Sequence, residues 1–89
     1  MPIIARYKGY RFFFFSNEGN PLEPVHVHVR NGARVAKYWV EPQISLAESY
    51  EMSPTELKEI ENVVRENEAQ IKEAWHDHFD SLGGKKSLV

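Results

Sequence analysis

Apolar and polar residues alternate along the first half of the chain, and this pattern predicts β-strands. Residues 3–7 and 10–16 are expected to form two strands joined by a tight turn or a bulge at Gly9. The stretch 17–24 is rich in residues that turns favour, so we expect a loop there. This part of the sequence therefore predicts a hairpin followed by a loop.

A second hairpin is predicted from the most regular alternation in the chain. Residues 25–30 alternate with a period of two and are followed by an Asn-Gly pair at 31–32, which two-residue type I′ turns prefer. Residues 33–40 should therefore return as the antiparallel partner strand. Pro42 ends that strand, and residues 43–50 fit either a short edge strand or an irregular link.

The second half of the chain contains an explicit helix start. Ser53 is placed as the N-cap, Pro54 as the first helical residue and Glu56 as the third, which completes a capping box. Met52 and Leu57 have the spacing of a hydrophobic staple. A helix is therefore predicted to begin at Pro54.

This helix is expected to run to Leu82. Apolar residues recur in it at three- and four-residue steps, at Leu57, Ile60, Val64, Ile71, Trp75, Phe79 and Leu82. At 1.5 Å per residue it would be about 43 Å long, so we expect a kink or an overhanging end. Asn67 interrupts the apolar stripe and is interpreted as a hydrogen-bonded polar residue at the edge of the core.

Together these elements predict a single α+β domain over residues 1–82. Its fold is a four- to five-stranded antiparallel sheet packed on one long C-terminal helix. A chain of 89 residues has room for one hydrophobic core. Residues 83–89 are expected to form a flexible C-terminal tail.

The predicted sheet is apolar on both faces, although one helix can cover only one of them. Four consecutive phenylalanines place two rings on each face, and Tyr38 and Trp39 also alternate. We therefore expect Phe13, Phe15, Tyr38 and Trp39 to bind a partner, either a second copy of the chain or another small protein. The alternative is that the N-terminal segment and residues 43–50 fold over the second face.

Composition and charge narrow the classes of protein to which the chain can belong. The absence of cysteine excludes disulfides, thiol nucleophiles and Cys-ligated zinc, and it fits a reducing, cytoplasmic compartment. No apolar run is long enough for a membrane span, so no membrane association is expected. Residues 1–40 carry six Lys or Arg against two Glu, whereas residues 41–89 carry five against eleven Asp or Glu. The two halves can neutralise each other in a compact domain, or the basic half can bind RNA.

The four histidines form two pairs with two-residue spacing. On a strand, His26 and His28 would place their imidazoles on one face about 6.6–7 Å apart, close enough to ligate one metal ion. A third ligand would have to be Glu23, Glu41 or Asp77, and nothing in the sequence selects among them. We therefore expect no cofactor, with a transition metal held by His26 and His28 as the alternative.

The second pair, His76 and His78, lies on the predicted helix, where residues two apart point in different directions. His78 falls within the apolar stripe and His76 well outside it. If the valines of residues 25–29 face the helix, His26 and its strand neighbours lie on the opposite face of the sheet, out of easy reach of both helix histidines. A site that joins the two pairs would then have to form across a dimer.

The same strand supports a catalytic alternative. His26, His28 and Arg30 would share one face, where the imidazoles could act as acid and base and the guanidinium could hold a phosphate. The chain would then be a small hydrolase or nuclease, with or without a metal. RNA binding without catalysis is a third hypothesis, and it rests on basic and aromatic residues of the strands: Arg6, Tyr7, Tyr10, Arg11, Phe12, Arg30 and Arg34.

Several segments carry a family resemblance, namely residues 6–18, 23–29, 36–42 and 74–76. With these segments, roughly residues 1–80 resemble the bacterial domain of unknown function 4160 family. The most specific element is a proline-led H-x-H on a strand, carried by Pro24, His26 and His28. Val25 departs from a second proline that is usual in the family, and His78 departs from a common aromatic residue.

The resemblance implies no established activity. Members of the family look like small bacterial proteins that are often encoded beside another small domain, of unknown-function type 2442. That arrangement is similar to two-gene toxin–antitoxin modules and implies partner binding. We therefore expect a cytoplasmic interaction module, leaning away from an enzyme, that dimerises or binds a small partner protein as one component of a toxin–antitoxin-like pair.

Overall fold

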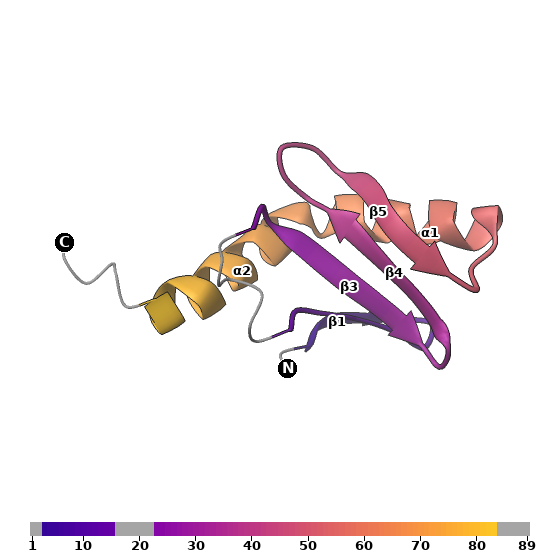
Figure 1. Cartoon of the computed structure of the whole chain (residues 1–89), viewed down its shortest axis with the longest axis horizontal. Helices are drawn as coiled ribbons and strands as arrows, with labels where there is room; N and C mark the ends of the chain where they lie inside the picture. Colours follow the sequence, from indigo (N-terminus) through magenta and orange to yellow (C-terminus); the bar gives the residue numbers. More distant parts are fainter. Residues whose placement is uncertain (1–2, 16–22, 84–89) are drawn as a thin grey trace.

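A computed structural model describes residues 3–15 and 23–83, with side chains described as far as Phe79. These residues form a five-stranded antiparallel sheet whose strand order follows the sequence, with two helices behind it (Figure 1). The elements are β1 (Ile3–Tyr7), β2 (Tyr10–Phe13), β3 (His26–Asn31), β4 (Arg34–Trp39), β5 (Ser45–Tyr50), α1 (Pro54–Glu66) and α2 (Glu68–Gly83). The α+β class and the antiparallel sheet are confirmed. Residues 17–22 of the predicted loop (17–24) and residues 84–89 of the predicted tail (83–89) lie outside the described residues, whereas Gly83 is the last residue of α2.

Both tight turns depend on backbone conformations with positive φ. Lys8 (φ 46°) and Gly9 (φ 84°) link β1 to β2, and positive φ at both central residues is the pattern of a type I′ turn. The turn predicted at Gly9 is thus confirmed. In the second hairpin the loop residues are Gly32 and Ala33, because Asn31 is the last residue of β3. This loop lies one residue later than predicted, and Gly32 supplies its φ of +64°.

The ambiguous segment after Pro42 is an edge strand. β5 pairs with β4 with a register shift that leaves Ala47 as the extra residue of a bulge. All six residues of β5 are exposed. At the opposite edge, β1 pairs with β2. The alternative in which these two segments fold over the second face is therefore wrong, because both extend the sheet sideways.

The helical part begins as predicted and bends at Asn67. Ser53 Oγ accepts a hydrogen bond from the Glu56 N–H at 3.1 Å, and the Glu56 carboxylate accepts one from the Ser53 N–H at 3.0 Å. At Asn67 the backbone leaves the helical region (φ −112°, ψ 18°), and the side-chain amide donates to the Val63 carbonyl at 2.8 Å. A side chain that folds back on the backbone in this way bends a helix. The prediction of one long helix is therefore wrong, whereas the expected kink and the bonded Asn67 are confirmed.

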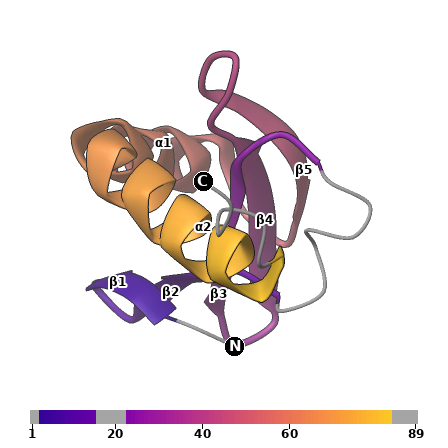
Figure 2. The same ribbon diagram turned by 90° about the vertical axis from the view of Figure 1, so that its left-hand side faces the viewer.

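The helices cover one face of the sheet and enclose the core (Figure 2). The side chains that are at most 2% exposed include Phe12, Val27, Val29 and Tyr38 from the sheet and Ile60, Val64, Ile71 and Trp75 from the helices. Burial of each large apolar side chain contributes about 1.5–3 kcal/mol. Neither helix in the described part of the chain is long and apolar enough to cross a membrane.

Two tyrosine–glutamate pairs tie the β1–β2 hairpin to α1. Tyr7 donates its hydroxyl hydrogen to Glu59, and Tyr10 donates to Glu56, both across 2.5 Å. The Tyr7 hydroxyl and the Lys8 ammonium group, 3.3 Å away, hold the pKa of Glu59 below its usual value. The backbone N–H of the helix N-cap, followed by the Tyr10 hydroxyl, lowers the pKa of Glu56. The hairpin is thus fixed to the helix by charge-assisted hydrogen bonds.

Candidate functional site

The face of the sheet opposite α1 is called the helix-free face below; α2 reaches its border at His26, the first residue of β3, through Trp75. The helix-free face lies toward the viewer in Figure 1. Directly paired residues of an antiparallel sheet point to the same side, so the register identifies its members. They are Ile3, Arg6, Arg11, Phe13, His26, His28, Arg30, Val35, Lys37, Trp39, Ser45, Glu48 and Tyr50.

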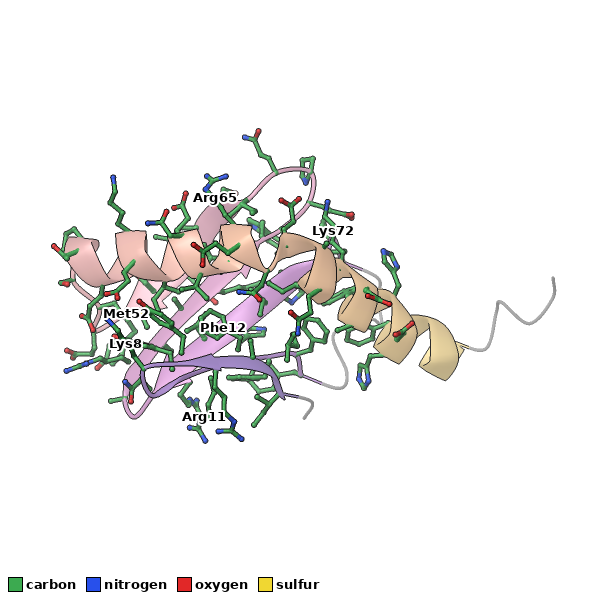
Figure 3. The ribbon with its side chains drawn as sticks, turned by 180° about the vertical axis from the view of Figure 1, so that it is seen from behind. Lys8, Arg11, Phe12, Met52, Arg65 and Lys72 are labelled. Atoms are coloured by element: carbon green, nitrogen blue, oxygen red, sulfur yellow. The ribbon has the colours of Figure 1, made fainter. Side chains whose placement is uncertain are left out.

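Three arginines form a row across this face. Arg6 of β1 pairs with Arg11 of β2, and Arg11 pairs with Arg30 of β3. All three are exposed, and Arg11 points away from the helices in Figure 3. The same line of pairing continues through Val35 to Tyr50. We call Arg6, Arg11 and Arg30 the arginine row.

The other residues that favoured RNA binding lie on the helix side of the sheet. Phe12 is buried under the helices, and Tyr7 and Tyr10 are bonded to α1 as described above. Arg34 forms an ion pair with Glu56 of α1 at 3.2 Å. Of the basic and aromatic residues in that hypothesis, the structure brings only the three arginines of the row together on the helix-free face.

The histidines of the H-x-H strand share one face, as the alternation predicted, but they differ in exposure. His26 is fully buried, whereas His28 is half-buried. His26 Nδ1 lies 2.9 Å from the Pro24 carbonyl oxygen and 3.7 Å from Glu23 Oε1. A carbonyl oxygen can only accept a hydrogen bond, so Nδ1 of His26 is the donor to Pro24.

Aromatic rings surround the two histidines. The His26 ring lies 5.3 Å from both His28 and Trp39 and 4.9 Å from Trp75 of α2, measured between centroids. The His28 ring lies 4.6 Å from Phe15 and is stacked on Phe13 at 5.7 Å. His26 therefore joins the end of α2 to the sheet, a packing role that the H-x-H spacing did not indicate.

The surroundings of His26 do not favour the alternative in which the chain is a hydrolase or nuclease. A general base must reach the proton that it removes, and His26 has no exposed surface. His26 and Arg30 are also four residues apart on one strand, about 13 Å at strand spacing, so they do not converge on one small group. Among residues 3–15 and 23–79, no cluster of three or more His, Asp or Glu side chains could hold a metal ion.

The helix histidines differ as the apolar stripe predicted. His76 is exposed, and His78 is half-buried with its ring 4.6 Å from Phe79 and 6.5 Å from Phe14. Trp75, a member of the predicted apolar stripe, is 2% exposed and packs edge-on against Phe14. The end of α2 is therefore held by aromatic packing.

The structure separates the four residues that were expected to bind a partner. Phe13, Phe15 and Trp39 lie on or beside the helix-free face, although Phe13 is only 5% exposed. Tyr38 is fully buried beneath α1, and its hydroxyl donates to the Leu57 carbonyl at 2.8 Å. Burial, followed by the charge of Glu61, raises the pKa of Tyr38 to about 12. Tyr38 therefore cannot contact a partner docked on the helix-free face.

Two features of the surface were not identified from the sequence. The first is the exposure of all six residues of β5, including Leu46 and Tyr50. An edge strand was one of the two alternatives predicted for residues 43–50, but the sequence there shows no strict alternation from which the exposed side chains could be identified. The second is the arginine row, which depends on the register between strands. The signal for it in the sequence is whether each arginine has an odd or an even position along its strand. That position assigns the arginine to a face of the sheet once both turns have been located.

One protein family is matched by the chain. The family model described as "Domain of unknown function (DUF4160)" covers residues 9–76, which include β2 to α1 and most of α2. No curated protein and no solved structure gave a match.

Proposed function

The chain belongs to this family of domains of unknown function, and we propose that it is a protein-interaction module that pairs with a second copy of itself along β5. The observation that carries the proposal is the exposure of the whole edge strand, with Leu46 42% and Tyr50 61% exposed. An edge strand presents backbone donors and acceptors to which another strand can be added. Large apolar side chains beside those groups strengthen such an addition.

A second copy is the occupant that needs nothing beyond the chain itself. Antiparallel pairing of two identical strands is related by a two-fold axis, which makes the contact self-complementary and closes the assembly at two copies. The paired sheets would also bring Tyr50 of each copy to one continuous helix-free face. A different small protein, the kind of partner that a toxin–antitoxin-like pair requires, would compete for the same edge.

The mass of the purified protein at low and high concentration tests the proposal. Light scattering should give a dimer at high concentration, and Leu46→Lys should give a monomer, because a charge on an edge strand opposes strand addition. Asn62→Lys is the matched control, since Asn62 is exposed on α1 and the change in charge is the same. A wild-type monomer at every concentration, or a dimer that survives Leu46→Lys, contradicts pairing through β5.

A further inference from the structure

We propose that the arginine row is a binding site for single-stranded RNA, separate from the β5 edge and independent of its pairing. The row spans β1, β2 and β3, whereas β5 is the edge strand at the other end of the strand order. The site is therefore assigned to a part of the molecule that the proposed dimer leaves accessible.

The charge of the row is not compensated by carboxylates in the described part of the chain. Within residues 3–15 and 23–79, neither Arg6 nor Arg11 nor Arg30 forms an ion pair with a carboxylate, whereas Arg34 and Arg65 both do. Like charges that lie directly opposite each other on neighbouring strands destabilise a sheet. Three guanidinium groups in register therefore favour an anionic ligand that spans all three strands.

The spacing of the row suits the phosphates of a nucleic-acid strand. Neighbouring strands are about 4.8 Å apart, so the outer two arginines are separated by about 10 Å at the backbone. Phosphates of a nucleic-acid strand follow one another at 3.4 Å or more, which gives the row roughly two or three phosphates to contact. Each guanidinium can hold a phosphate with two parallel hydrogen bonds.

Aromatic rings beside the row favour RNA over an acidic protein as its ligand. A shallow hollow of about 80 Å³ is lined by Ile3, Arg11, Phe13 and Arg30, so an aromatic ring borders the charged groups. Phe13 is stacked with His28, and Phe15 packs edge-on against both rings while keeping 39% of its surface exposed. Nucleobases stack on exposed aromatic rings beside basic groups, whereas the carboxylates of an acidic peptide gain nothing from them.

Fluorescence anisotropy at low salt with a labelled oligouridine tests the site. The oligouridine has about 12 nucleotides, a length within the range that single-stranded binding domains cover. The triple variant Arg6→Gln/Arg11→Gln/Arg30→Gln should bind at least tenfold more weakly than the wild type. For this variant, the slope of log K against the logarithm of the salt concentration should be smaller in magnitude by about 2, because each lost phosphate contact removes about 0.7 from the slope. Phe15→Leu, which keeps an apolar side chain but removes the ring, should weaken binding roughly fivefold.

The matched control is Lys58→Gln/Arg65→Gln/Lys72→Gln, which removes the same charge from the helices. It should retain binding. Leu46→Lys should also retain it, because Leu46 pairs with Tyr38 on the helix side of the sheet, away from the row. The thermal midpoint of the arginine variant should not fall, since the change relieves repulsion between like charges.

Four outcomes would overturn the proposal. The first is no binding of oligouridine by the wild type, and the second is an equal loss in both triple variants, which would indicate general electrostatic attraction. The third is equal or tighter binding of single-stranded DNA of the corresponding sequence, and the fourth is tighter binding of a polyglutamate peptide. Each outcome can occur whether or not the protein dimerises through β5.

Discussion

The two edges of the sheet differ in how they are protected. At β1, Gln70 of α2 donates to the Ile4 carbonyl at 3.5 Å, and Tyr7 is bonded to Glu59 of α1. At β5, no side chain forms a hydrogen bond or ion pair to either helix within the described residues. Both edge strands carry a register irregularity, so a bulge does not distinguish them. Contacts with the helices protect the β1 edge from strand addition, whereas the β5 edge remains available for it.

The same contrast predicts where the stability of the domain resides. The helices contact the β1–β3 side through hydrogen bonds and aromatic rings, whereas β5 is held by its pairing with β4. A strand whose side chains are exposed contributes little buried apolar surface, and such regions open locally at lower free energy than the core. Hydrogen exchange should therefore be slower in β1 than in β5 of the monomer.

The largest expected effect comes from Trp75, which contacts Phe14 and His26 from α2. Trp75→Ala should lower the free energy of unfolding by about 3–5 kcal/mol, because it removes a buried ring and leaves a cavity. Tyr50→Ala on β5 should change it by no more than about 0.5 kcal/mol. Urea unfolding of the monomeric Leu46→Lys background measures both, and similar losses at the two positions would refute the contrast.

A smaller effect is expected when the hydroxyl groups of Tyr7 and Tyr10 are removed. The double variant Tyr7→Phe/Tyr10→Phe keeps both rings but loses the hydrogen bonds to Glu59 and Glu56. Exchange of the β1 amides should become faster, while exchange of the β5 amides stays the same. Tyr50→Phe is the control, and an equal change in both edge strands would show that the tyrosines act on global stability alone.

The smallest expected effect is a loss of folding stability at acidic pH. The pKa values of Glu56 and Glu59 are below 4.5 in the folded chain, so their stabilising contribution is complete above that value and is lost as the pH falls through the folded pKa values. Stability of the wild type should therefore decline below about pH 4.5 more steeply than that of Glu56→Gln/Glu59→Gln. Parallel profiles from urea unfolding between pH 6 and pH 3 would exclude this role for the two carboxylates.

The elements with strong local signals were predicted correctly from the sequence. The β3–β4 pairing follows from the alternation of residues 25–30, and the start of α1 follows from the capping box at Ser53. A kink or an overhanging end was expected from the length of the helix, yet the division into two helices depends on one bond from the Asn67 side chain to the Val63 carbonyl. Whether such a residue bends a helix or points to solvent is decided by its surroundings.

The candidate site was less accessible to prediction, because burial depends on tertiary packing. Alternation placed His26 and His28 on one face, but it could not show that Trp75 closes over His26. Tyr38 and Trp39 were both expected to contact a partner, and only the strand register shows that Tyr38 lies beneath α1. Periodicity assigns residues to faces, and the fold decides which face is covered.

The strand order also has a consequence for how the chain is synthesised. Each strand pairs with its neighbour in the sequence, so these contacts are local and close quickly. The sheet is complete at Tyr50, but the helices that cover Phe12, Val27 and Tyr38 are complete only near Gly83. At 5–20 residues per second, the roughly thirty residues between these points take about 2–6 s to emerge from the ribosome. During that interval the apolar face of the nascent sheet is exposed, which makes this the stage at which a chaperone is most useful.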